Sequence, residues 1–517
     1  MEKTDARRVI APIQSGATQT STFWKDRRMG IAVAFFIAAL AGVLIALALP
    51  RGPVTQTQAL ILVGVSVTVG VLSSLTMRSR WALLWVPLVH ILALELVKPH
   101  LLGPTVGSLR LDESYGVLAF LLGRGLYGLV VVIPMILGVY LGLVLSHKLS
   151  GAQASSFVSW IPTMLASLIL LGLGFWIALP ASTPPILGDD GKPLEGSIAE
   201  LTTVRLGGLE QSIMIRGYST KKPVLLYLNG GPGQSGLPFT RVVLAELSRD
   251  FVIVDWDQRG AGKSYPALEP TSSLTLKGAV GDTVELAQYL GKRFGEQKIY
   301  LMGESWGSIL GVLAVQRRPD LFYAFIGSGQ MVSPRETDGR IYQDVLDLAA
   351  RLGNTGLADK MRGYGRPPYA DLPYANVFAM NQYDALYKPY TPSKAYRDLG
   401  NASGIGPYGV FASEYNLIEK FNVLRGLMDT FTVMYPQLQQ LDFRRDAQRL
   451  EVPVYLLDGT AELAARRDLA LEWFGALKAP QKRVFRLENA AHSVAFEQFE
   501  ALGKIMLETV LPETYPQ

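Results

Sequence analysis

The chain has 517 residues, more than one domain usually contains, and 49% of them are hydrophobic. It carries a formal net charge of +5 but no dense stripe of lysine and arginine, which argues against a nucleic-acid-binding protein. It has no cysteine, which excludes disulfides, thiolate catalysis and zinc sites built from cysteine.

The first half of the chain predicts an α-helical membrane domain over residues 30–180. A spanning helix needs about 20 apolar residues, because the hydrocarbon core of a bilayer is roughly 30 Å thick. The third candidate stretch is the weakest, since it contains His90 and ends with Glu95 and Lys98. We expect about five transmembrane helices, at 30–49, 58–76, 81–97, 125–146 and 156–180.

Basic residues predict the orientation of this multi-pass domain in the plasma membrane, because lysine and arginine are enriched on the cytoplasmic side. The polar tail of residues 1–29 is rich in both, and Arg78 and Arg80 follow the second span. We therefore expect a cytoplasmic tail. Five spans then place the C-terminal half outside the cytoplasm, whereas four spans, without 81–97, place it inside.

A linker is expected at residues 181–197, which are rich in proline, glycine and aspartate and have no hydrophobic period. The second domain, 198–517, begins with two strand-like runs that suggest a hairpin, and apolar strands then alternate with helices. This order is typical of a mostly parallel sheet covered on both faces. The expected strands are Thr202–Leu206, Gln211–Arg216, Val224–Leu228, Phe251–Trp256, Lys298–Met302, Phe322–Ile326, Val454–Leu457 and Arg483–Leu487, with helices at 276–294, up to Arg317 and at 495–510.

Residues 333–447 interrupt this alternation. They are polar and aromatic, are punctuated by glycine and proline, and show helical stretches near 341–352 and 412–431. We expect a helical cap inserted over the mouth of the sheet. Five of its aromatic residues are candidates for an apolar pocket or for ordinary cap core: Tyr369, Tyr374, Phe378, Tyr383 and Tyr387.

The sequence Gly303-Glu-Ser305-Trp-Gly307 follows a predicted buried strand and opens a predicted helix. Glycines at both ends permit a turn tight enough to hold the serine in a strained conformation with its hydroxyl exposed. The start of the helix favours negative charge that develops nearby. This context predicts that Ser305 is a nucleophile.

A general base for Ser305 is indicated by exclusion. His492 is the only histidine outside the apolar half of the chain, and it lies between the last predicted strand and the last helix. Imidazole suits this role, since its ordinary pKa is near 6.5. The acid that orients it should follow the strand Val454–Leu457. Glu462 is the preferred candidate and Asp458 the alternative.

An oxyanion hole needs two backbone N–H groups directed at the acyl oxygen. One is expected from Trp306, directly after the nucleophile, and the other from Gly231 in the Gly-Gly loop after Val224–Leu228. Asp257 and Arg259 are interpreted as a charge pair that braces these loops.

Together these motifs resemble those of the proline iminopeptidase family, the serine aminopeptidase branch of the α/β-hydrolases. The resemblance covers about residues 200–515 and implies an α/β-hydrolase fold with an inserted helical cap. It also implies release of an N-terminal residue, often proline, from short peptides, without a metal or an organic cofactor. The matching segments are Asn229-Gly-Gly-Pro-Gly233, Asp257-Gln-Arg-Gly-Ala-Gly-Lys-Ser264, Gly303-Glu-Ser-Trp-Gly307 and Glu488-Asn-Ala-Ala-His492.

Three departures from the family pattern stand out. Asn229 replaces the first histidine of the family's H-G-G-P-G, and Glu462 stands where the family usually has aspartate. The family's cap also contributes a glutamate that binds the free amino group of the substrate. Glu414 is a loose match for that residue and Glu419 is its rival, and both also fit the role of solvated cap residues.

These features predict a membrane-anchored serine aminopeptidase that acts on small peptides. An alternative is a membrane-associated lipid or acyl-ester hydrolase, because the same residues cleave esters. The intact set of Ser305, His492 and Gly231 argues against a non-catalytic membrane protein whose hydrolase domain has lost its activity. The expected partners are a peptide or acyl-ester substrate and the lipid bilayer, and no nucleic acid.

Overall fold

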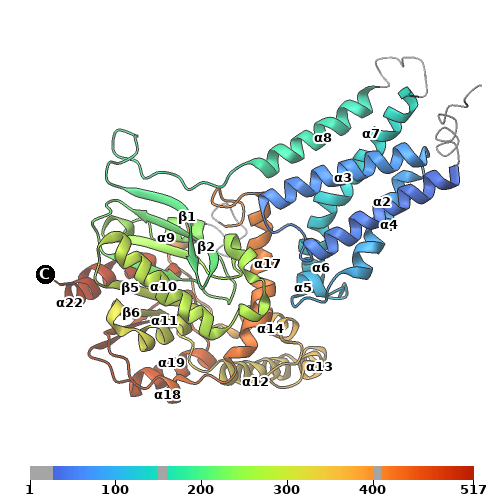
Figure 1. The fold of residues 1–517 in the computed structure, drawn as a ribbon. Helices are drawn as coiled ribbons and strands as arrows, with labels where there is room; N and C mark the ends of the chain where they lie inside the picture. The colour runs from blue at the N-terminus through green and yellow to red at the C-terminus, as the bar shows by residue number, and fades with distance from the viewer. Residues whose placement is uncertain (1–26, 150–159, 400–408, 517) are drawn as a thin grey trace, which may run out of the picture. The chain divides into compact units, whose positions relative to one another are not determined.

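A computed structural model describes residues 27–149, 160–399 and 409–516 (Figure 1). The chain divides into two compact units. The first comprises the described parts of Met1–Gly52, Leu60–Pro99 and Tyr127–Phe175, and the second comprises Pro53–Ala59, His100–Leu126 and the described part of Trp176–Gln517. Most of the tail 1–29 lies outside the described residues, and the domain limits expected from the sequence remain a prediction.

Four helices in the described part of the chain are long and apolar enough to cross a membrane. They are α2 (Arg27–Ala48), α3 (Gln56–Met77), the continuous stretch Ser114–Leu149 that ends in α7 (Ile133–Leu149), and α8 (Ile161–Ala178). A fifth apolar helix, α4 (Ala82–Val97), has 16 residues, so its length is about 24 Å. The described residues therefore contain four long apolar helices and one shorter apolar helix, α4, where the sequence predicts about five spans.

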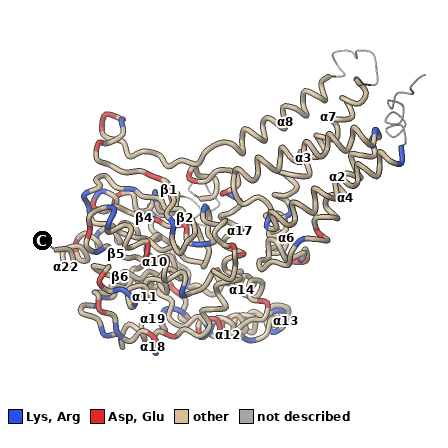
Figure 2. Tube along the Cα trace, in the orientation of Figure 1, with Lys and Arg blue, Asp and Glu red and all other residues tan. Residues whose placement is uncertain are grey.

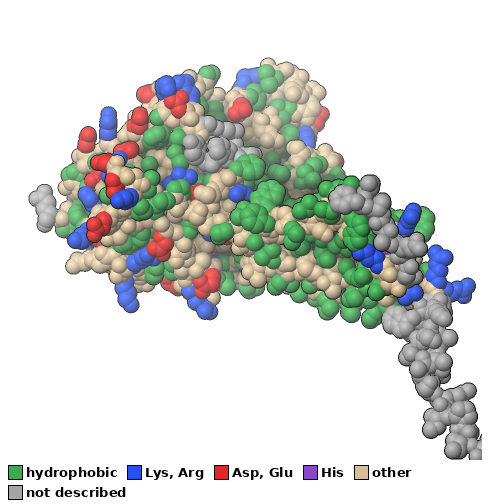
Figure 3. All heavy atoms as spheres, turned by 90° about the horizontal axis from the view of Figure 1, so that it is seen from above, with side chains coloured by type: hydrophobic (Ala, Val, Ile, Leu, Met, Phe, Trp, Pro, Cys, Tyr) green, Lys and Arg blue, Asp and Glu red, His purple; other side chains and the backbone are tan. Residues whose placement is uncertain are grey.

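Charged residues are sparse along these helices and gather at their ends (Figure 2). Hydrophobic side chains are the most frequent kind on the face of these helices seen on the right of Figure 3. Glycines let two of the helices approach closely. A Cβ at Gly138 would lie 2.4 Å from the carbonyl oxygen of Val67, and one at Gly70 would lie 2.3 Å from that of Met135. Small residues that let helix backbones approach closely are typical of helices that pack in membranes.

The described part of the second unit contains one eight-stranded sheet in the order β1-β2-β4-β3-β5-β6-β7-β8. β1 and β2 form the predicted antiparallel hairpin, β2 pairs antiparallel with β4, and every later neighbour is parallel. The mostly parallel sheet expected from the sequence is thus confirmed. The strands are β1 (Ile198–Leu206), β2 (Leu209–Gly217), β3 (Val224–Leu228), β4 (Val252–Asp257), β5 (Ile299–Glu304), β6 (Phe322–Ser328), β7 (Val454–Gly459) and β8 (Lys482–Leu487).

Helices cover both faces of the sheet because the central strands are apolar on both sides. In β3, Leu226 and Leu228 belong to one buried cluster, and Leu225 and Tyr227 belong to the other. Successive side chains of a strand point to opposite faces, so each cluster fills one face. The first cluster includes α10 (Leu276–Phe294), α11 (Trp306–Arg317) and α19 (Ala464–Ala476), and the second includes α9 (Leu237–Val243), α20 (Val494–Glu497) and α21 (Phe499–Ile505).

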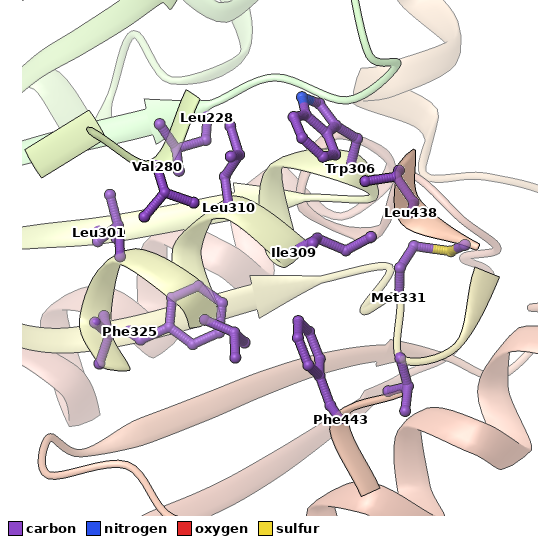
Figure 4. Close-up of a cluster of buried hydrophobic side chains, with 14 of the residues drawn as sticks. Leu228, Val280, Leu301, Trp306, Ile309, Leu310, Phe325, Met331, Leu438 and Phe443 are labelled. Atoms are coloured by element: carbon purple, nitrogen blue, oxygen red, sulfur yellow. The ribbon is translucent and has the colours of Figure 1, made fainter. Parts of the chain in front are cut away.

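Helix α11 packs tightly on the strand beneath it (Figure 4). Its residues Ile309 and Leu310 lie among the labelled apolar side chains, near Phe325 of β6. A Cβ at Gly311 would lie 2.2 Å from Cε2 of Phe325, so glycine is needed for this close approach. The packing fixes the start of α11, where the candidate nucleophile lies.

The predicted cap is present as helices between β6 and β7. Its helical stretches are longer than expected: the one near 341–352 is α12 (Pro334–Leu352), and the one near 412–431 is α17 (Leu417–Met434). A capping box between Asn416 and Glu419 defines the start of α17. The other α-helices in the described residues of the cap are α13 (Thr355–Tyr364), α14 (Leu372–Met380), α15 (Tyr383–Leu386), α16 (Lys394–Asp398) and α18 (Phe443–Asp446).

The sequence did not indicate that residues 100–126 pack with the second unit. This segment, called the interhelical segment below, contains α5 (Pro104–Gly107), α6 (Ser114–Phe120) and the π-helical turn η1 (Leu121–Gly125). Thr105 donates to Asp429 of α17 from its backbone N at 3.1 Å and from its Oγ1 at 2.5 Å. The membrane half predicted from composition is therefore interrupted by a segment of the hydrolase unit.

Candidate active site

Ser305 occupies the tight turn between β5 and α11. Its φ of +52° lies in the left-handed region, which is uncommon for any residue except glycine. A Cβ at Gly303 would lie 2.2 Å from the carbonyl oxygen of Gly307, and a Cβ at Gly307 would lie 2.1 Å from that of Leu228. Both glycines are thus required by close backbone contacts, as the motif predicts.

His492 lies in the loop between β8 and α20, and its Nδ1 is hydrogen-bonded to Oε2 of Glu462. An ionised carboxylate only accepts hydrogen bonds, so Nδ1 carries the proton and Nε2 is left as the basic nitrogen. The structure therefore brings together the predicted base and the preferred acid. Ser305 and His492 line the same cavity.

Glu462 is buried and remains ionised. Burial alone would raise its pKa, but the neighbouring His492 ring and Arg466 guanidinium lower the pKa of Glu462 to about 2. Arg466 Nη1 lies 3.4 Å from Glu462 Oε1, and the backbone N of Leu463 donates to the same oxygen at 2.7 Å. The alternative acid, Asp458, accepts instead from Arg486 Nε at 3.1 Å.

A buried carboxylate beside the nucleophile joins the Ser305 turn to the His492 loop. Glu304 accepts from Tyr227 Oη at 2.8 Å and from Ser493 Oγ at 2.9 Å. Burial raises the pKa of Glu304. Sequence reasoning missed this brace, because it depends on Ser493, a residue that carries no motif of its own. The position of Glu304 directly before the nucleophile was the available signal.

The predicted oxyanion loop is tied to the nucleophile turn through Gln258. Gln258 Nε2 donates to the carbonyl oxygen of Asn229 at 3.1 Å, and its Oε1 accepts from Trp306 Nε1 at 2.8 Å. Asn229 is itself buried and donates to Asp255 at 2.5 Å. Gly231, with φ +110°, and Trp306 both line the cavity that contains Ser305. Both predicted oxyanion donors therefore lie at the cavity.

The predicted Asp257–Arg259 pair is wrong, although both residues do brace loops. Arg259 forms a bidentate pair with Asp282 of α10, at 3.0 and 2.8 Å. Asp257 accepts from Ser235 Oγ and from the backbone N of Lys263 at 2.7 Å. Burial raises the pKa of Asp257 to about 7. The two side chains have different partners, which their closeness in sequence does not reveal.

The cavity above Ser305 has a volume of about 550 Å³. This size suits a small organic ligand or a short peptide. Its polar lining residues include Ser305, Asp338, Arg466 and His492, and most of the wall is apolar. Of the five cap aromatics named from the sequence, the described lining includes Tyr383 and Tyr387. The apolar members of the wall include Leu118, Ile309, Ile341, Val377, Met380, Leu424, Leu427, Met428 and Phe431.

The two glutamates predicted to bind a substrate amine are engaged elsewhere. Glu414 is buried and pairs with Arg241 at 2.5 Å, and Glu419 pairs with Lys263 at 2.7 Å. Neither is among the described residues that line the cavity. Asp338 of α12 does line it and accepts from Tyr435 Oη at 2.8 Å. Burial raises the pKa of Asp338 to about 6.

In the described parts of the chain, no three histidine, aspartate or glutamate residues are grouped so that they could hold a metal ion. The Ser305 hydroxyl, the His492 imidazole and the residues Gly231 and Trp306 lie at the cavity, and Glu462 is hydrogen-bonded to the imidazole from outside the described lining. This set is suited to acyl transfer through a covalent serine intermediate.

Comparison with known proteins places residues 223–367 in a family described as alpha/beta hydrolase fold. A probable aminopeptidase of Bacillus subtilis, YbaC, is 29% identical over 310 residues, which are 59% of this chain and 94% of that protein. A probable proline iminopeptidase of Leptolyngbya boryana is 32% identical over 128 residues, 25% of this chain and 37% of that protein. A solved structure of a proline iminopeptidase-related protein from Thermus thermophilus is 20% identical, with a TM-score of 0.42, and covers 62% of this chain and 99% of its own.

Proposed function

Because this chain belongs to the α/β-hydrolase family and is a serine hydrolase, we propose that it is a membrane-anchored aminopeptidase that uses Ser305, His492 and Glu462. The hydrogen bond between His492 and Glu462, beside the cavity that Ser305 also lines, carries this proposal. The relatives named aminopeptidase and proline iminopeptidase support the choice of substrate class.

In the proposed reaction, Ser305 Oγ attacks the carbonyl carbon of the first peptide bond while His492 Nε2 takes the hydroxyl proton. The oxyanion accepts hydrogen bonds from the backbone N–H groups of Gly231 and Trp306. His492 then gives its proton to the leaving nitrogen, and the N-terminal residue remains as an ester on Ser305. Water, deprotonated by His492, releases it. Glu462 holds the ring and stabilises the imidazolium in both steps.

A free N-terminal amine needs an anionic partner in the cavity. We propose Asp338 for this role, because Glu414 and Glu419 are held by Arg241 and Lys263. Asp338 lines the cavity, and with a pKa of about 6 it is ionised at neutral pH. An ammonium that pairs with it in a partly dry site gains a charge-assisted hydrogen bond of about 1.5–3 kcal/mol.

The test is a comparison of a prolyl arylamide with its N-acetylated form and a medium-chain ester. Wild-type enzyme is expected to cleave the free amine about ten- to a hundred-fold faster than the acetylated form. Asp338→Asn should erase this preference, while Glu414→Gln, matched in chemistry, should preserve it. Equal rates on the first two substrates with faster cleavage of the ester would favour the alternative, an acyl-ester hydrolase, which the apolar wall of the cavity supports.

The proposed anchor consists of the long apolar helices, and we further propose that the hydrolase unit lies outside the cytoplasm. This orientation depends on whether α4 spans, because it makes the number of spans odd. Its 16 residues can span a bilayer only if the bilayer thins or the flanking residues extend to the interface. Four spans would instead place the hydrolase unit in the cytoplasm.

A further inference from the structure

We propose that the substrate of this enzyme is an amphiphile with a long alkyl chain, and that the interhelical segment (residues 100–126) forms the wall along which the chain lies. The inference rests on the proposed chemistry of Ser305, but it does not depend on whether an amide or an ester is cleaved. It concerns the part of the substrate that lies away from the reacting carbonyl.

The interhelical segment is fastened firmly to the cap. Asp429 of α17 is buried and accepts from Thr105 twice and from Tyr265 Oη at 2.7 Å. Gly103, with φ +128°, fits against it, because a Cβ there would lie 2.4 Å from Asp429 Oδ1. Ser108 Oγ and Tyr374 Oη are hydrogen-bonded at 2.7 Å. The segment is therefore a built part of the hydrolase unit and not a loose connection.

The same segment supplies part of the cavity wall. Tyr115 and Leu118 of α6 line the cavity, together with Leu424, Leu427 and Met428 of α17. The edge of the Tyr115 ring meets the ring of Tyr374, with centroids 5.1 Å apart. Two elements separated by about 300 residues in sequence thus share one apolar wall.

The outer part of this wall is exposed as well as apolar. Leu118, Leu427 and Met380 line the cavity, yet they are 42%, 39% and 53% exposed. Leu109 and Leu121 of the interhelical segment are exposed as well, but neither is among the described residues that line the cavity. Apolar residues gathered at the mouth of a cavity mark a site for an apolar ligand or a membrane surface.

One helical stretch links the cavity wall to a candidate membrane span, and this link favours an amphiphile of the bilayer as the ligand. α6 is the first part of the 36-residue apolar helical stretch Ser114–Leu149, one of the candidate spans. The residues that reach the cavity and those proposed to cross the membrane therefore belong to one helix. An amphiphile of the bilayer with its alkyl chain against Leu118 would present its carbonyl to Ser305, which lines the same cavity.

The experiment measures how fast the full-length enzyme, in one fixed detergent, reacts with alkyl fluorophosphonates of different chain length. These probes label an active serine whatever its natural substrate is. We expect the dodecyl probe to react at least about tenfold faster than the ethyl probe. Burial of only two of its additional methylene groups would be enough to give this ratio. Leu118→Ser should reduce this ratio at least about threefold. Leu109→Ser, an exposed leucine of the same segment outside the described cavity lining, should leave it unchanged.

Equal rates for the two probes, or equal effects of Leu118→Ser and Leu109→Ser, would overturn the inference and leave the serine hydrolase intact. Absence of labelling by every probe would overturn the proposed function, and the inference with it. A second comparison uses prolinamides of butylamine and dodecylamine and p-nitrophenyl esters of butyric and dodecanoic acid. It shows whether the long chain belongs to the leaving group or to the acyl group.

Discussion

Replacement of Glu462 by glutamine keeps the size of the side chain and removes its charge. The fall in its pKa from an ordinary 4.5 to about 2 corresponds to a net preference of about 3 kcal/mol for the ionised carboxylate, left after the opposing cost of burial. His492 and Arg466 together supply this stabilisation. If most of it stabilises the imidazolium in the transition state, its loss lowers kcat about 100-fold. Loss of the correct ring tautomer raises the effect toward about 10⁴-fold.

The assay is kcat on a prolyl arylamide, with Asp458→Asn as the matched control. Asp458 bonds to Arg486 and not to His492, so its replacement should change kcat by less than about threefold. Arg466 retains Tyr383 Oη at 2.7 Å and Tyr387 Oη at 3.0 Å when Glu462 is changed, and thermal unfolding shows whether the fold survives. A larger loss for Asp458→Asn than for Glu462→Gln, in two folded proteins, would contradict the assignment of the acid.

Three further predictions concern stability and topology. Burial raises the pKa of Asp338 to about 6, above its ordinary 3.8, so ionisation of this carboxyl destabilises the fold as pH rises from about 4 to 6. Asp338→Asn should therefore raise Tm at pH 8 but not at pH 4. An increase in Tm at pH 4 and not at pH 8 would refute the burial argument. Gly307→Ala places a Cβ 2.1 Å from the carbonyl oxygen of Leu228 and should destabilise the protein by more than about 2 kcal/mol. Gly339→Ala should not, because a Cβ at Gly339 meets open space. Equal unfolding curves for the two variants would exclude the close contact. Protease added outside intact cells should digest residues 185–517 and spare the tail 1–29; full protection of 185–517 would indicate four spans and a cytoplasmic enzyme.

Much of the hydrolase fold follows from the sequence because its signals are local. A buried parallel strand is apolar at every position, as in β3, and the glycines around Ser305 meet backbone atoms of adjacent elements. His492 could be identified by exclusion, since the hydrolase half has no other histidine. Local sequence patterns therefore predict both the sheet and the positions of Ser305 and His492 in the loops that follow its strands.

The remaining features depend on pairings between residues far apart in sequence. Nothing near Thr105 indicates that it meets Asp429, and this pairing decides that the interhelical segment joins the hydrolase unit. Glu414, in the turn before α17, pairs with Arg241 of α9, and no local pattern indicates this distant partner. An apolar run does not by itself mark where a helix begins, and the helix predicted at 125–146 belongs to a helical stretch that begins at Ser114.

The most direct test of the central claim is the site of labelling by a fluorophosphonate probe in the full-length protein, mapped by mass spectrometry. If Ser305 is the nucleophile activated by His492, the label is found on Ser305, and Ser305→Ala abolishes both labelling and hydrolysis. His492→Ala should leave Ser305 in place but slow its labelling by at least about 100-fold. A label on another residue, or hydrolysis that persists in Ser305→Ala, would contradict the proposed mechanism.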